Sequence, residues 1–88
     1  MAQAQLISQT PPVYPPMAKM AKVEGPVVLQ LVVGKEGAVE ELRVISGHPM
    51  LVQAALDAVR QWRYHPYLLN GKPVEFETQV TVSFKLAQ

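Results

Sequence analysis

The last part of the chain carries its most regular pattern of hydrophobic and polar positions. Between Val74 and Leu86 every second residue is apolar apart from Thr78, and the residues between them are polar. This alternation predicts one long β-strand with one face on a core and the other in water. At about 3.3 Å per residue the strand would span roughly 40 Å, much longer than a usual strand. We therefore expect part of it to extend beyond its neighbours.

Two earlier strands are predicted on either side of a tight turn. The run Val27 to Val33 is rich in β-branched residues and apolar on both parities, which is typical of a central strand. The turn 34–37 contains two glycines, and the segment Ala38 to Ser46 follows it as a second strand. Its apolar positions are spaced first by three and then by two, so we expect a β-bulge near Glu40 and Glu41.

Helical spacing predicts two helices. The segment Pro16 to Lys22 can form two turns with its apolar residues, Met17, Met20 and Ala21, toward the core. The segment Pro49 to Arg63 is expected to be the main helix, with Ser46 or His48 near its cap and Pro66 stopping it. Its apolar stripe consists of Leu51, Ala55, Ala58, Val59 and Trp62. Asp57 and Arg60 are expected to pair on the solvent side.

This order of elements predicts the α+β class. The three strands would form an antiparallel sheet that packs on one main helix, so the domain has two layers. The short helix precedes the strands. A right-handed crossover through the main helix places the third strand beside the first, in the order 2-1-3. The long last strand is then an edge of the sheet.

Composition adds a boundary near the N-terminus. Of the eight prolines in 88 residues, four fall within Pro11 to Pro16, and they favour polyproline II. We predict that residues 1–13 are the flexible end of a proline-rich linker and that residues 14–88 are the folded domain. No run is apolar enough to span a membrane, and the first residues do not have the pattern of a signal peptide.

Charge and residue types argue against several functions. Eight Lys and Arg stand against seven Asp and Glu without a basic stripe, which argues against nucleic-acid binding. Cysteine is absent, and His48 and His65 would lie about 25 Å apart at opposite ends of a regular helix, too far to share a metal. No set of nucleophile, base and oxyanion donors can be assembled. We expect neither an enzyme nor a cofactor.

The predicted edge remains as a candidate site. The stretch Val80 to Phe84 is uncharged and prone to form a strand, so its outer backbone groups invite another strand. A partner peptide could add there by β-augmentation. The N-terminal segment or a second copy of the chain could cover the same edge, and composition does not separate these alternatives.

Several motifs taken together resemble the C-terminal domain of TonB energy transducers, over about residues 14 to 86. The matching positions are Tyr14-Pro15, Ala18, Ala21, Glu24-Gly25, Val27, Gly37, Val39, Val44, Ser46, Ala55, Ala58, Trp62-Arg63-Tyr64, Pro66, Val82, Phe84 and Leu86. The resemblance implies a domain in the periplasm, in a protein anchored in the inner membrane by an N-terminal helix not present here. Such a domain binds the Ton box of an outer-membrane transporter by strand addition. It passes on force from the ExbB–ExbD motor for uptake of siderophores, vitamins or similar nutrients.

The resemblance also assigns residues. The strand that pairs with the partner maps to Val80, Thr81, Val82, Ser83, Phe84, Lys85 and Leu86. The polar segment before the Tyr-Pro motif adds Gln9, Thr10 and Tyr14, with Pro11 where some members have a glutamine. Structural roles fall to Pro15, Gly25, Gly37, Trp62, Tyr64 and Pro66. The stretch Tyr67 to Pro73 is longer than in well-known members, which favours an extra small strand or hairpin around Asn70-Gly71.

One alternative role stays open. TonB-like domains also occur fused to unrelated membrane proteins, and an exposed edge allows copies to exchange their last strands. The domain would then be a self-assembling module, present as a homodimer, or a sensor module.

Overall fold

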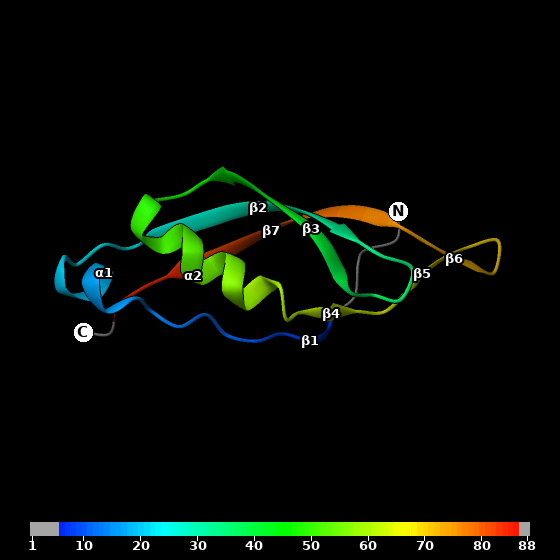
Figure 1. The fold of residues 1–88 in the computed structure, drawn as a ribbon, viewed down its shortest axis with the longest axis horizontal. Helices are drawn as coiled ribbons and strands as arrows, with labels where there is room; N and C mark the ends of the chain where they lie inside the picture. Colours follow the sequence, from blue (N-terminus) through cyan, green and yellow to red (C-terminus); the bar gives the residue numbers. More distant parts are fainter. Residues whose placement is uncertain (1–5, 87–88) are drawn as a thin grey trace.

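The computed structural model describes residues 6–86, whose elements run along an elongated molecule of 50 × 21 × 21 Å, with α1 at one end and β5 and β6 at the other (Figure 1). In chain order the elements are β1 (Leu6–Ser8), α1 (Pro16–Met20), β2 (Gly25–Val33), β3 (Val39–Ser46), α2 (Pro49–Val59), β4 (Arg63–Tyr64), β5 (Tyr67–Leu69), β6 (Lys72–Val74) and β7 (Phe76–Phe84).

The main sheet has the predicted class and order. Its three strands lie in the order β3-β2-β7, and both pairings are antiparallel. This is the order 2-1-3 predicted from the right-handed crossover. The β2–β7 pairing runs without a register shift from Gly25 opposite Phe84 to Val33 opposite Phe76. Strand β7 is therefore a long, regular edge strand, as predicted.

The predicted bulge in β3 is confirmed. Val32 lies opposite Glu41 and Val33 opposite Val39, so Glu40 is the extra residue. The insertion shifts the alternation by one position, so that Val39 and Leu42 can both pack against the core despite their spacing of three. A second register shift follows between Leu29, opposite Val44, and Val28, opposite Ser46.

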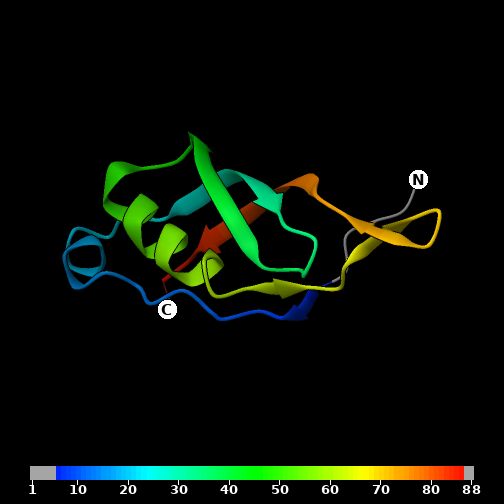
Figure 2. The ribbon, with the colours of Figure 1, turned by 45° about the vertical axis from the view of Figure 1, so that its right-hand side comes forward.

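The core lies between α2 and one face of the sheet (Figure 2). Alternate residues of β2 are fully buried there, and Val82 and Phe84 of β7 join them. The helix contributes the predicted stripe, namely Leu51, Ala55, Ala58, Val59 and, beyond its end, Trp62. Burying each large apolar side chain stabilises the fold by about 1.5–3 kcal/mol. Within residues 6–86, no helix covers the other face of the sheet.

Both helices end earlier than predicted. Helix α2 stops at Val59 rather than Arg63, because the N–H groups of Gln61 and Trp62 bond three residues back and tighten the chain into a turn. That turn still delivers Trp62 to the core. His48 is the N-cap, and its Nδ1 accepts a hydrogen bond from the Met50 N–H at 3.1 Å. The predicted pair of Asp57 and Arg60 is present at 3.3 Å on the exposed side.

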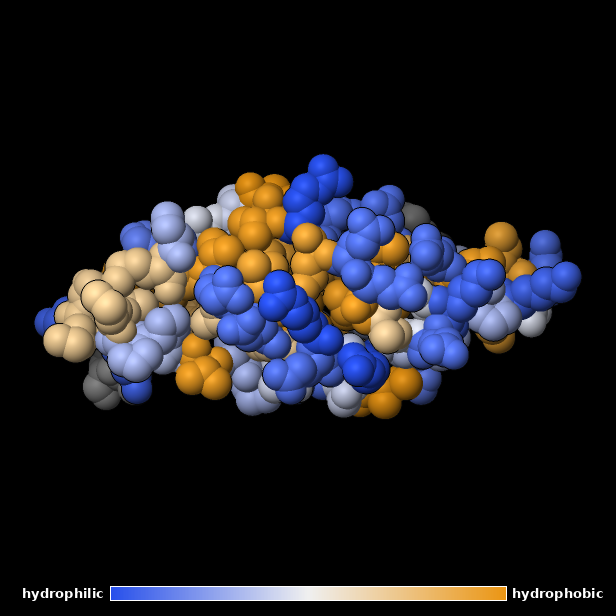
Figure 3. Space-filling model, in the orientation of Figure 1, coloured by the Kyte–Doolittle hydropathy of each residue, from blue (hydrophilic) through white to orange (hydrophobic). Residues whose placement is uncertain are grey.

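Helix α1 is one turn long, and the prediction that its methionines face the core is wrong. Met17 is 71% exposed and Met20 84% exposed, and Ala21 is exposed as well. Only Ala18 is buried, because the Val23 N–H bonds to the Ala18 carbonyl and turns the chain away after one turn. The apolar surface of this end is visible in Figure 3.

The predicted strand from Val74 to Leu86 is interrupted. Glu75 separates β6 from β7, and β6 pairs with β5 rather than continuing the sheet. The reason is that β2 ends at Val33, opposite Phe76, so residues before Phe76 have no neighbour in the main sheet. Asn70 and Gly71 both have positive φ, at 53° and 78°, and close the expected hairpin.

The N-terminal segment carries one strand that the sequence does not predict. Within the predicted linker 1–13, Leu6 pairs with Tyr64 and Ser8 with Arg63, forming the small β1–β4 sheet. Residues 1–5 lie outside the described residues. No helix in the described range 6–86 is long and apolar enough to cross a membrane.

Candidate functional site

The two edges of the main sheet differ sharply. The outer strand β3 is interrupted by two register shifts and carries Glu40, Glu41 and Arg43, which are features that obstruct strand addition. Strand β7 is regular and uncharged from Thr78 to Phe84. In an antiparallel sheet, every second residue of such an edge turns its N–H and C=O away from its neighbour. The free backbone groups of β7 are therefore the unguarded ones.

A groove of about 370 Å³ runs beside this edge. One wall is Thr81, Val82 and Ser83 of β7, and the other is the segment 9–12, which we call the strap. Trp62 also contributes to the lining, and none of the lining residues carries a charge. Of the predicted N-terminal contacts, the structure brings Gln9 and Thr10 to this groove.

Trp62 fixes the position of the strap. Its indole Nε1–H donates a hydrogen bond to the Thr10 carbonyl at 2.9 Å, across 52 positions of sequence. The ring itself is only 3% exposed, so it fills the core at the same time. The sequence predicts only a structural role for Trp62, packing the end of the main helix on the core. The sequence carries no local signal for the hydrogen bond to the strap, because any backbone carbonyl can accept a bond from an indole N–H.

The predicted edge residues divide by the direction of their side chains. Val82 and Phe84 point into the core, whereas Thr81, Ser83 and Lys85 are exposed. Val80 and Leu86 are partly buried, and the Leu86 N–H donates to a carboxylate oxygen of Glu24 at 2.6 Å. Because alternate side chains are committed to the core, a partner on this edge would be held mainly by backbone groups.

The Tyr14 side chain packs against the core and does not line the groove. Its hydroxyl donates a hydrogen bond to the Val23 carbonyl, and its ring meets Phe84 edge-on, with centroids 5.5 Å apart. Burial raises the pKa of the Tyr14 phenol, and the Glu24 carboxylate raises it further. Tyr14 therefore anchors the chain just after the strap.

A pH prediction follows from the tyrosines. Burial also raises the pKa of Tyr64, whose ring packs edge-on against Phe76. A phenol with a raised pKa in the folded state stabilises the fold fully below its unfolded pKa of about 10, and this stability is lost at higher pH. We expect the free energy of unfolding to fall between pH 9 and 11 in urea titrations. Tyr64→Phe, which keeps the ring, should reduce that fall; an equal fall in both proteins would contradict the assignment.

The remaining predicted structural residues lie at junctions. Gly37 meets Tyr64, whose N–H bonds to the Gly37 carbonyl at 2.9 Å. Pro15 is the residue that caps α1, Gly25 begins β2 opposite Phe84, and Pro66 separates β4 from β5. The Gly37–Tyr64 hydrogen bond and the Ala38–Arg63 bridge hold β4, and through it β1, against the turn between β2 and β3.

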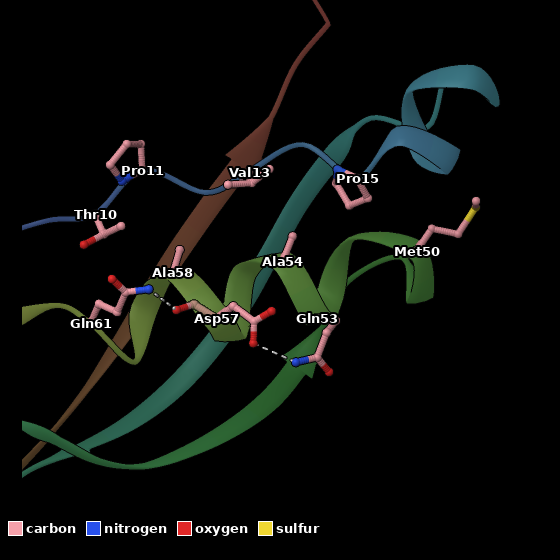
Figure 4. Close-up of a pocket in the computed structure, with 10 residues that line it drawn as sticks. All are labelled: Thr10, Pro11, Val13, Pro15, Met50, Gln53, Ala54, Asp57, Ala58 and Gln61. Carbon is pink, nitrogen blue, oxygen red and sulfur yellow. Dashed lines mark hydrogen bonds between the residues drawn. The ribbon is translucent and has the colours of Figure 1, made fainter.

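A second hollow, also of about 370 Å³, lies on the other side of the strap (Figure 4). Pro11, Val13 and Pro15 line it from the N-terminal segment, and Ala54 and Ala58 line it from α2. The strap is thus flanked by open space on both sides, and its position depends on its few specific contacts. Within residues 6–86, no group of three or more His, Cys, Asp or Glu residues could hold a metal ion.

An exposed, regular sheet edge is the feature to which an extended peptide adds in β-augmentation. Residues 10–86 match the family model described as the Gram-negative bacterial TonB protein C-terminal. The chain belongs to this TonB C-terminal family.

Individual relatives agree with the family model. The chain is 33% identical over 85 residues to Protein TonB of Vibrio cholerae, covering 94% of this chain and 35% of that protein. It is 36% identical to Protein TonB of Xanthomonas campestris, over 90% of this chain and 36% of that protein. The solution structure of the Pseudomonas aeruginosa TonB C-terminal domain superposes with a TM-score of 0.81 at 26% identity, covering 100% of this chain and 91% of that one. The chain spans about a third of the length of the two TonB proteins from Vibrio cholerae and Xanthomonas campestris.

Proposed function

We propose that this chain is the periplasmic domain of a TonB-like energy transducer that binds the Ton box of an outer-membrane transporter by strand addition to β7. The observation that carries the proposal is the contrast between the two sheet edges: β3 is bulged and charged, while β7 is regular and uncharged over Thr78–Phe84. Family membership supports the same role. The role is mechanical, so it requires no catalytic group and no cofactor.

Strand addition suits the transmission of force. A partner paired along β7 would share a pull among several backbone hydrogen bonds, each worth only about 0.5–1.5 kcal/mol. Strand β7 is in turn paired with β2 along its whole length, so the load passes into the centre of the sheet. We propose that the force derives from the proton gradient through ExbB and ExbD. It would reach this domain from an anchor in the inner membrane and drive uptake of a siderophore, a vitamin or a similar nutrient.

A second candidate shares the same edge. The open edge of β7 and the single residue Glu75 between β6 and β7 would also permit two copies to exchange β7 and form a homodimer. Such a dimer would suit a self-assembling or sensor module. Light scattering across a concentration series separates the two: a monomer that binds peptide supports transduction, and a concentration-independent dimer supports exchange.

The direct test is a titration with N-terminal peptides from TonB-dependent transporters. We expect at least one peptide that carries a Ton box to bind with a Kd in the micromolar to millimolar range, and a scrambled peptide of equal composition not to bind. Amide shifts in nuclear magnetic resonance spectra should concentrate on residues 80–86 and 9–12. Absence of binding at millimolar concentrations for every Ton-box peptide would overturn the proposal.

A further inference from the structure

The edge of β7 stays open although an extended segment of the same chain lies next to it. The strap borders the groove opposite Thr81–Ser83, yet none of its residues belongs to a strand. An unpaired edge ordinarily recruits a neighbouring extended segment, because pairing satisfies backbone groups on both. Something in the strap must therefore prevent it from closing onto β7.

Two prolines remove the donors that closure would need. Proline has no backbone N–H, and Pro11 and Pro12 are consecutive. Alternate residues of an extended chain turn their N–H groups to the same side. Whichever side of the strap faced β7, one of the two prolines would stand there without a donor. A strand ladder between the strap and β7 would be incomplete in either orientation.

Trp62 binds one carbonyl of the strap and fixes its position. The Thr10 carbonyl is already bonded to the indole N–H, at 2.9 Å, and the indole itself lines the groove. The strap is also fixed on both flanks. Before it, Ser8 pairs with Arg63, and after it, Tyr14 bonds to the Val23 carbonyl and packs on Phe84. The strap is thus held by β4, by Trp62 and by the anchoring of Tyr14, and not by strand pairing with the edge of β7.

The groove borders a short stretch of the edge. Its β7 wall consists of Thr81, Val82 and Ser83. A strand rises about 3.3 Å per residue, so about three residues of a partner would pass between β7 and the strap.

Resting on the proposed function, we propose that the strap is a fixed second wall that keeps the β7 edge open for a single extended peptide, with Trp62 as the residue that positions it. The peptide would be uncharged where it passes Thr81–Ser83, since no charged residue lines the groove. Its outer edge would face Pro11 and Pro12, which offer no donors, so the sheet cannot grow by a further strand. The prolines thus act against both self-closure and chain-like assembly.

The first test needs no partner. In the double variant Pro11→Thr/Pro12→Thr, the strap regains two donors and β-prone side chains. We expect hydrogen exchange of the outward-facing amides among residues 80–84 to slow at least tenfold relative to wild type. Pro73→Thr is the matched control, because it restores a donor in the distant β6 and should leave these amides unchanged. Unchanged exchange in the double variant, with the fold intact by circular dichroism, would overturn the proposal.

The second test separates positioning from packing. Trp62→Phe keeps an aromatic ring in the core but lacks the N–H that holds Thr10. We expect backbone order parameters of residues 9–12 to fall and the affinity for an acetylated, amidated Thr-Val-Thr-Val-Thr-Val peptide to drop about three- to tenfold. Leu51→Met, a core change away from the strap, should leave both unchanged. Unaltered strap order in Trp62→Phe would overturn the positioning role.

The two tests also distinguish this inference from the proposed function. Suppose that hydrogen exchange of the β7 edge amides slows in the proline variant while no Ton-box peptide binds the wild type. The proposed role of the strap is then supported, and the proposal of Ton-box binding is overturned. If Ton-box peptides bind the wild type and the proline variant equally well, Ton-box binding stands and the strap proposal fails.

Discussion

Replacing Gly37 by alanine should lower the free energy of unfolding by about 3 kcal/mol or more. Gly37 has a φ of +89°, which is strained for any other residue and costs about 1–3 kcal/mol. A Cβ built there would also overlap the carbonyl oxygen of Tyr64, a backbone atom that cannot rotate away. For a domain of this size the loss corresponds to a fall in Tm of about 12 °C or more.

The damage should reach the candidate site. Gly37 accepts the N–H of Tyr64, and β4 in turn pairs with β1 just before the strap. Displacing Tyr64 therefore loosens one flank of the groove. We expect Gly37→Ala to weaken Ton-box peptide binding even at temperatures where the variant remains folded, as measured by calorimetric titration.

Gly71→Ala is the matched control. Gly71 also has a positive φ, +78°, but nothing lies within 4 Å of the added Cβ, and the turn projects into solvent. It should cost only about 1 kcal/mol of backbone strain and leave peptide binding unchanged. Equal destabilisation by the two alanines would show that the contact with Tyr64 contributes nothing beyond the backbone conformation.

The elements that the sequence predicts best are those whose burial is repeated along many residues. The alternation before Phe84 and the stripe from Leu51 to Trp62 each repeat one pattern of burial over several residues. The sequence alone therefore shows the pattern. The bulge at Glu40 is predicted for the same reason, because a break in alternation is itself a local signal. Fold class, strand order and the open edge all follow from these elements.

What escapes prediction depends on single contacts between distant residues. The bond from Trp62 to Thr10 and the pairing of β1 with β4 leave no periodic trace, since each involves one or two backbone groups. Met17 is exposed for a local reason, because a helix of one turn buries only one residue, Ala18, against the core. The edge of the site is thus visible in the sequence, whereas its second wall is not.

Prolines placed at Thr81 and at Val82 should have opposite effects, which makes them the sharpest test of pairing along β7. Thr81 lies opposite Val28 and Val82 opposite Val27 in an unbroken antiparallel register. Of two adjacent residues in such a strand, one bonds to β2 and the other turns its N–H outward. Proline at the inward position removes a ladder hydrogen bond and should cost clearly more than about 1 kcal/mol. Proline at the outward position should leave stability within about 1 kcal/mol, as edge strands tolerate it.

Peptide binding should separate the same two variants. The outward proline loses a donor and places its ring in the path of the incoming strand, so Ton-box affinity should fall at least tenfold in a fully folded protein. Thr81→Ala keeps the N–H and should bind like the wild type, because backbone groups carry the contact. Urea denaturation and calorimetric titration give both quantities on the same samples. If both proline variants fold and each binds the peptide as tightly as the wild type does, the peptide must bind elsewhere on the domain. Loss of binding in the outward variant while it stays fully folded would mean that a force on the peptide enters the sheet through the backbone of β7.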